Sequence, residues 1–198
     1  MHTLMQNARA FRDEAAARAD EFGRLASGQS PQALFITCSD SRVIPSLITG
    51  ARPGELFELR TAGNIIPVHR PDRPTSEAAT IEYAIDVLGV SDIVVCGHSH
   101  CGAVGAMVRG EDLSGVPAVR DWLGSSPPPA VAEDARHAGD VAEAVQDHVL
   151  RQLRTLRDHP AVARGCAEER LGLHAWFYEI ATGSVLVHRP HADAFLPL

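Results

Sequence analysis

The sequence predicts an α/β fold with a mostly parallel central β-sheet flanked by helices. Short apolar runs, typical of strands buried on both faces, alternate with amphipathic helical stretches. Two of these runs lead directly into loops that carry Cys, His and Asp side chains. The chain ends in two strand-like runs around a Thr182-Gly183 turn, so we expect about four parallel strands and an antiparallel edge strand.

A long amphipathic helix is predicted at the start of the chain. Apolar residues recur at three- or four-residue steps from Leu4 to Leu25, which places them on one helix face. Gly28 and Pro31 end this helix. A helix of this kind either packs on its own domain or packs on a partner subunit. The pattern alone leaves both alternatives open.

The remaining elements are predicted from the same signals. Strands are expected at Ala33–Thr37, Leu56–Arg60, Asp92–Cys96, Leu171–Ile180 and Val185–His188. Helices are expected from Ser76, as the N-cap, to Gly89, from Cys101 to Val108, and from Val141 to Leu156. The stretch 110–139 is the least regular part of the chain, and we expect a surface excursion with short helical pieces there.

Length and composition exclude several classes of protein. The 198 residues fit one domain, and the 45% of hydrophobic and 22% of charged residues are ordinary for a globular protein. A net charge of −7 argues against binding to nucleic acid, which needs a basic face. No apolar run reaches the length of a membrane span, and no secretory h-region is present near the N-terminus, so a cytoplasmic location is expected. Four Cys are too few for a disulfide scaffold and indicate metal or catalytic use.

Two clusters of reactive side chains follow predicted buried strands. One is Cys38-Ser39-Asp40-Ser41-Arg42, and the other is Gly97-His98-Ser99-His100-Cys101-Gly102. Ligands of open α/β sheets bind at the carboxyl ends of the strands, so the two loops could meet over one crevice. Cys38, His98 and Cys101 would then offer two sulfurs and one nitrogen, which suits zinc. Three protein ligands leave a fourth position open, as catalytic zinc sites do.

The two motifs together resemble the β-carbonic anhydrase signature, in which Cys-x-Asp-x-Arg precedes His-x-x-Cys. The similarity extends through RPGELFELRTAGN, SEAATIEYAIDVLGV and SDIVVCGHSHCGAV, and more weakly to HAWFYEIATG. It divides a single domain into four parts: an N-terminal helix arm (1–28), a zinc-site core (33–108), a variable surface excursion (110–139), and a C-terminal helix with a strand hairpin (140–198).

The resemblance implies one Zn²⁺ per subunit, bound by Cys38, His98 and Cys101, with hydroxide in the fourth position. That hydroxide would hydrate carbon dioxide reversibly to bicarbonate and a proton. Two thiolates cancel the charge of zinc and make it a weaker acidifier of water. Asp40 is therefore expected to orient the hydroxide and Arg42 to hold Asp40. Asp40 could also fill the fourth position itself in a closed form, and it is a conditional ligand.

The resemblance also implies a substrate pocket, a second anion site and an oligomer. Phe57 and Tyr83 stand where the family has pocket-wall aromatic residues, some of which come from across a dimer interface. Ala62, Gly63 and Gly102 are expected near the same pocket. Arg60 and Tyr178 match a second bicarbonate site of some members, but Phe35 stands where a Trp would be. Loss of the indole N–H argues against bicarbonate regulation there. A homodimer, homotetramer or other even homo-oligomer is expected.

Other functions remain possible on the sequence alone. The same zinc site could hydrolyse carbonyl sulfide or carbon disulfide. A non-catalytic zinc-binding protein is also possible, with Asp40 completing a four-ligand site. A thiol redox protein is disfavoured because the chain has no Cys-x-x-Cys pair.

Overall fold

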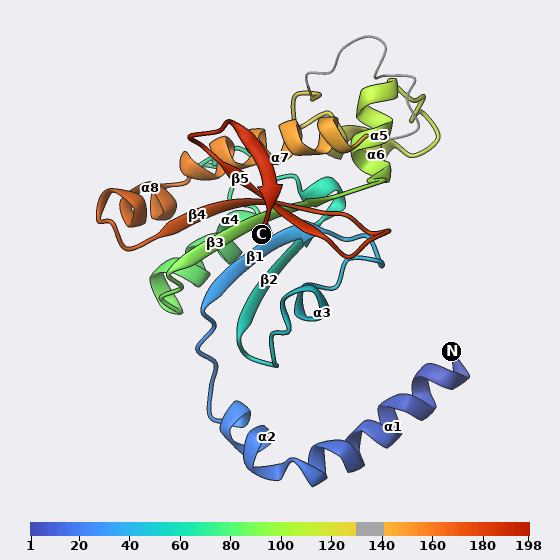
Figure 1. Cartoon of the computed structure of the whole chain (residues 1–198), viewed down its shortest axis with the longest axis vertical. Helices are drawn as coiled ribbons and strands as arrows, with labels where there is room; N and C mark the ends of the chain where they lie inside the picture. The colour runs from blue at the N-terminus through green and yellow to red at the C-terminus, as the bar shows by residue number, and fades with distance from the viewer. Residues whose placement is uncertain (130–140) are drawn as a thin grey trace.

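The computed structural model describes residues 1–129 and 141–198 and shows a six-stranded mixed sheet flanked by helices (Figure 1). The strand order is β2-β1-β3-β4-β5-β6. The strands are β1 (Ala33–Cys38), β2 (Leu56–Thr61), β3 (Asp92–His98), β4 (Gly172–Tyr178), β5 (Val185–Arg189) and β6 (Ala194–Pro197). β1 to β4 are parallel and β5 and β6 antiparallel, so the predicted fold class is confirmed. The prediction of one antiparallel strand missed β6, a short edge strand that contains Pro197.

Eight α-helices lie in the described part of the chain. They are α1 (His2–Ala17), α2 (Ala19–Ala26), α3 (Pro45–Thr49), α4 (Ser76–Glu82), α5 (Gly102–Arg109), α6 (Pro117–Leu123), α7 (Ala142–Arg157) and α8 (Pro160–Ala167). α3 and α8 were not predicted. Each begins with a proline, which is favoured at the first helical position because its missing N–H needs no partner there. α6 is one of the short helices expected in 110–139, and residues 130–139 of that stretch lie outside the described residues.

The helix after Pro74 differs in detail from its prediction. Thr75, not Ser76, is the N-cap of α4, because its hydroxyl oxygen accepts a hydrogen bond from the Ala78 N–H. A π-helix (η2, Tyr83–Val87) continues α4, and Gly89 follows with a φ of 69°. The left-handed backbone at Gly89 ends the helix as expected.

The main hydrophobic core lies between one face of the sheet and α7. Alternate residues of β1 and β3 enter this core, including Leu34, Ile36, Ile93 and Val95, all 0% exposed. α7 contacts both β3 and β4, and α4, α5 and α8 pack close by. Because α7 lies directly on β3, it also lies near the loop that follows this strand.

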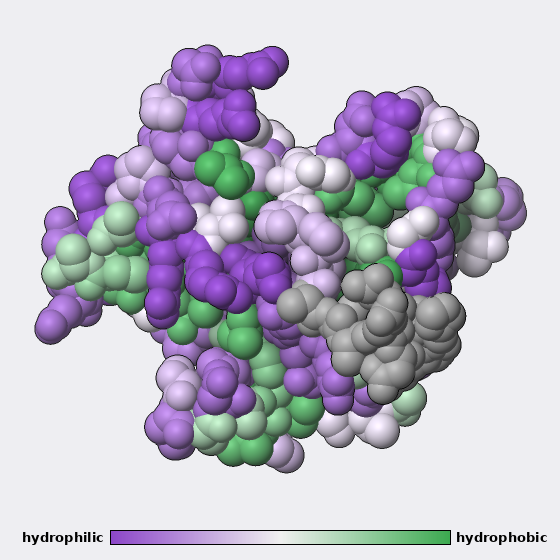
Figure 2. Space-filling model, turned by 90° about the horizontal axis from the view of Figure 1, so that it is seen from above, coloured by the Kyte–Doolittle hydropathy of each residue, from purple (hydrophilic) through white to green (hydrophobic). Residues whose placement is uncertain are grey.

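The N-terminal helix is present but divided. A non-helical backbone at Arg18 separates α1 from α2, and neither helix has a buried residue. Leu4, Met5 and Phe11 are at least half exposed on α1, which lies away from the sheet (Figure 1). The face of the molecule seen from above in Figure 2 is mainly hydrophilic, with hydrophobic residues in small patches. No helix of the described chain is long and apolar enough to span a membrane.

The strand order places a topological switch point between β1 and β3. From β1 the chain goes first to β2 on one side and then to β3 on the other side. The carboxyl ends of β1 and β3 therefore face a crevice that no crossover connection covers. Both predicted reactive loops begin at this crevice.

Candidate metal centre and active site

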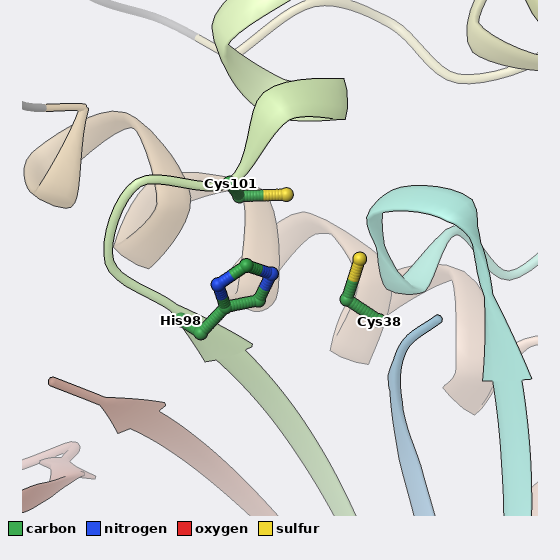
Figure 3. A group of neighbouring side chains, drawn as sticks. All are labelled: Cys38, His98 and Cys101. Carbon is green, nitrogen blue, oxygen red and sulfur yellow. The ribbon is translucent and has the colours of Figure 1, made fainter. Parts of the chain in front are cut away.

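Three side chains converge at the switch point as the sequence predicts. Cys38 is the last residue of β1, His98 is the last residue of β3, and Cys101 directly precedes α5. One ligand atom of each lies within 4.8 Å of the others, and all three residues are buried. Figure 3 shows the two sulfurs and the imidazole pointing toward a common space. The parallel register explains the approach, because Thr37 pairs with Cys96 and Cys38 is therefore level with the end of β3.

The imidazole of His98 is oriented by the backbone. Its Nδ1 lies 2.9 Å from the Ser99 carbonyl oxygen, which can only accept a hydrogen bond. A proton on Nδ1 leaves Nε2 with a free lone pair. Nε2 is buried and has no hydrogen-bond partner among the described residues. A buried, unpartnered nitrogen beside two sulfurs is what a metal ligand requires.

The two thiols are not equivalent. The interaction with Cys101 contributes most to lowering the pKa of the Cys38 thiol to about 4, and a hydrogen bond from the Gly63 N–H to Cys38 Sγ, 3.3 Å long, assists. The pKa of Cys101 is raised by the same interaction with Cys38 and by burial. Ionisation of one thiol therefore disfavours ionisation of the other. A divalent cation between the two sulfurs would remove this conflict and allow both to bind as thiolates.

Asp40 is held by Arg42. Arg42 Nε and Nη2 donate to the two carboxylate oxygens over 2.9 and 2.7 Å, and the Arg42 backbone N–H donates to Oδ1. This bidentate pair holds the pKa of Asp40 well below its usual range. Asp40 Oδ2 also lies 3.9 Å from His98 Nε2, so the carboxylate faces the candidate metal site without belonging to the cluster of Cys38, His98 and Cys101.

Arg60 supports the loop after β1. It donates hydrogen bonds to three backbone carbonyl oxygens, those of Cys38, Asp40 and Val43. Five N–H groups on one rigid guanidinium suit it for this role. The loop carrying Cys38 and Asp40 is thus tied to β2. Arg60, which was expected in a second bicarbonate site, has a structural role here.

The other residues of that second site lie on the sheet. Tyr178 ends β4 and packs with Phe35 of β1 in a small cluster that also includes Val94 and Cys96. Phe35 contacts the ring of Trp176 edge-on, with centroids 5.9 Å apart. A second anion site at Arg60 and Tyr178 stays a prediction.

The predicted pocket residues fall into two groups. Ala62 and Gly63 form a 3₁₀ turn, η1 (Ala62–Asn64), beside Cys38, and Gly102 follows Cys101. Phe57 and Tyr83 instead contact each other, with ring centroids 5.9 Å apart. Phe57 precedes Thr61, the partner of Cys38, by four residues, or about 13 Å along a strand. These two rings therefore lie away from the metal centre of their own chain.

Sequence reasoning missed the residues that hold the turn beside Cys38. Trp122 Nε1 donates to the Ala62 carbonyl oxygen over 2.9 Å, and His148 Nε2 lies 2.8 Å from the Gly63 carbonyl oxygen. The side-chain oxygen of Gln152 accepts from the Ile66 N–H. Trp122 lies in the irregular stretch, and His148 and Gln152 are polar residues on the buried face of α7. A polar residue at a core position of an amphipathic helix was the signal available for the last two.

The donor set fits zinc. Two sulfurs and one imidazole nitrogen, buried at one point and open to a fourth ligand, match the preferences of this ion. The fold and this site define an α/β protein with a candidate site for a single metal ion.

Comparison with known proteins identifies the family. A family model described as carbonic anhydrase matches residues 33–185. A protein of Pseudomonas aeruginosa named carbonic anhydrase is 48% identical over 178 residues, which cover 88% of this chain and 80% of that protein. The solved structure of the β-carbonic anhydrase CcaA has a TM-score of 0.88 and 34% identity, covering 100% of this chain and 99% of that one. A crystal structure from Sordaria macrospora, described as a tetrameric β-carbonic anhydrase, has a TM-score of 0.76 and 28% identity over 94% of each chain.

The chain belongs to the β-carbonic anhydrase family. The family predicted from the two motifs is thereby confirmed, and so is the predicted enzyme class, carbonic anhydrase.

Proposed function

We propose that this protein catalyses the reversible hydration of carbon dioxide to bicarbonate and a proton at a zinc ion held by Cys38, His98 and Cys101. The carrying observation is that the three buried ligands meet beside a carboxylate that Arg42 holds in a bidentate pair. Zinc bound there would lower the pKa of a water molecule so that hydroxide is available near neutral pH.

Asp40 would orient the attacking oxygen. An ionised carboxylate only accepts hydrogen bonds, so Asp40 can accept one from the hydroxide and leave a lone pair of the hydroxide oxygen directed at carbon dioxide. Arg42 keeps Asp40 ionised and fixed, since its guanidinium occupies both carboxylate oxygens. Arg42 Nη2 also donates to the His100 carbonyl oxygen, 3.2 Å away, and so links the loops after β1 and β3.

The position of Asp40 argues against a non-catalytic zinc protein. In such a protein Asp40 would be the fourth ligand, but here its carboxylate is bound to Arg42. A state in which Asp40 leaves Arg42 and binds the metal requires that this pair break. The open arrangement supports the catalytic function, and the conditional ligand role of Asp40 remains a prediction.

The functional unit is proposed to be a homodimer or a larger even assembly. The apolar side chains Leu4, Met5 and Phe11 of α1 are exposed in the single chain, and Phe57 and Tyr83 lie away from its own metal centre. A second copy could cover the arm and bring its own aromatic pair toward the first copy's pocket. The cytoplasmic location expected from the sequence likewise stays a prediction.

Stopped-flow hydration of carbon dioxide, followed with a pH indicator on protein of measured zinc content, tests the proposal. Asp40→Asn should lower kcat/KM at least about 100-fold with zinc retained, because an amide cannot replace the ionised acceptor. Cys38→Ala should lose both zinc and activity. Asp112→Asn, at an exposed turn where Asp112 bonds only Ser114 among the described residues, is the matched control and should leave the rate unchanged.

One outcome refutes the proposal. Protein with one zinc per chain that hydrates no carbon dioxide would direct the search to carbonyl sulfide and carbon disulfide as substrates.

A further inference from the structure

The peptide group between Ala62 and Gly63 has a hydrogen-bond partner at each end. Its carbonyl oxygen, on Ala62, accepts a hydrogen bond of 2.9 Å from Trp122 Nε1. Its N–H, on Gly63, donates to Cys38 Sγ over 3.3 Å. Because a peptide group is planar and trans, its C=O and N–H point in opposite directions on one rigid unit. The direction of the indole N–H therefore helps to fix the direction in which the Gly63 N–H meets the sulfur.

We propose that Trp122 is a positioning residue for the metal centre, acting on Cys38 through the Ala62–Gly63 peptide. A donor at the carbonyl oxygen polarises the peptide and strengthens its N–H as a donor, by about 10–30% per bond in a hydrogen-bonded chain. A stronger N–H donor stabilises the negative charge of the Cys38 thiolate. Partners of this kind, one step beyond the ligands, tune metal affinity. The inference rests on the proposed function, because it takes Cys38 as a ligand.

The turn around this peptide is restricted on its other side as well. Gly63 has a φ of 70°, and a Cβ there would lie 3.0 Å from Ala103 Cβ. The next carbonyl oxygen, on Gly63, lies 2.8 Å from His148 Nε2. The turn is thus held between α6 and α7, and Trp122 supplies the contact on the α6 side. Loss of the Trp122 hydrogen bond should therefore alter the contact between the Gly63 N–H and Cys38 Sγ, because the turn has little freedom to adjust.

The residue comes from the stretch that has no regular pattern in the sequence. α6 lies in that stretch, and the Trp122 ring packs against the cluster formed by Ile65, Ala106 and Leu123. Ala62 is exposed, so water can reach its carbonyl oxygen when the indole N–H is removed. Loss of the N–H should therefore change the donor strength and order of the turn without unfolding the protein.

Trp122→Phe removes the N–H and keeps an aromatic ring. Trp176→Phe is the matched control, because Trp176 is the only other Trp of the chain and lies on β4 against Phe35. Two readouts avoid the use of carbon dioxide: the NMR chemical shift and exchange rate of the Gly63 amide proton, and the rate of zinc transfer to a chromogenic chelator. We expect Trp122→Phe to shift the Gly63 proton upfield, speed its exchange, and accelerate zinc loss by about 3- to 10-fold, below the 10- to 100-fold of directly bonded partners. Trp176→Phe should change neither.

Unchanged Gly63 and zinc readouts in Trp122→Phe would overturn the proposal, as would equal changes in both variants. A purely structural role predicts a lower Tm with no selective change at Gly63, and that result also contradicts it. If the native protein binds no zinc, the proposed function fails on its own. The Gly63 amide proton of the metal-free protein then still decides whether Trp122 acts on this peptide.

Discussion

Helix α7 lies against strand β3 at Gly97, the residue before His98, with no room for a side chain between them. A Cβ on Gly97 would lie 2.5 Å from Val145 Cγ1 and 2.6 Å from Val149 Cγ2, and both valines are 0% exposed. Real Cβ atoms do not approach other carbons this closely. The substitution Gly97→Ala therefore forces α7 away from the sheet or forces both valines into other rotamers.

The expected cost is that of overpacking a core, about 1–3 kcal/mol of unfolding free energy. For a chain of 198 residues this corresponds to a Tm lower by about 2–12 °C, at about 2–4 °C per kcal/mol. Thermal and urea unfolding at one fixed protein concentration would measure it, since the stability of an oligomer depends on concentration. Gly115→Ala is the control, because a Cβ there meets nothing within 4 Å.

A second substitution tests whether the contact with α7 is the cause. Val145→Ala alone removes two buried methyl groups and should cost about 1.6 kcal/mol or more. In the double variant the clash with Val145 is removed and the clash with Val149 remains, so the combined loss should be about 1 kcal/mol less than the sum of the two single losses. A Gly97→Ala protein within about 0.5 kcal/mol of the native one, or strictly additive losses, would refute the reasoning.

Two further predictions concern a buried histidine and the arm. Burial lowers the pKa of His148, so between its unfolded value of 6.5 and its folded value only the unfolded state binds the proton. The free energy of unfolding is therefore at its full value above pH 6.5 and falls as the pH drops below it. His148→Gln should flatten this fall, measured by urea unfolding at saturating zinc between pH 7.5 and about 5.5. An identical pH dependence in the variant would contradict this. Removal of residues 1–28 should lower the number of chains per assembly, measured as the light-scattering mass divided by the mass of the truncated chain, because the exposed Leu4, Met5 and Phe11 would be lost. An unchanged number of chains would show that the arm is not an interface.

Much of the fold and the approach of Cys38, His98 and Cys101 could be predicted because the signals are local. The apolar run Ala33–Thr37 and the motif after it specify both a buried strand and the point at which it ends, and the same holds for Asp92–Cys96. Parallel pairing then brings Cys38 and His98 to one edge of the sheet. No tertiary information beyond the fold class was needed for that result.

The missed features have weak local signals or none. β6 is only four residues long and contains a proline, so the sequence there does not show the pattern of a strand. Arg18 ends α1 although it is a good helix former, so propensity gives no sign of the break. The hydrogen bond from Trp122 to Ala62 spans 60 positions, and nothing in the pattern around either residue indicates it.

Gly97 and the turn beside Cys38 are connected through α7. The helix that packs on Gly97 with Val145 and Val149 also carries His148, which lies 2.8 Å from the Gly63 carbonyl oxygen. Displacement of α7 by a Cβ at Gly97 would move His148 in the same direction and weaken its hold on Gly63. The Gly63 N–H, which meets Cys38 Sγ, would then lose part of its fixed orientation. Gly97→Ala should therefore accelerate zinc loss as well as lower the Tm, although residue 97 contributes no side chain to the metal centre.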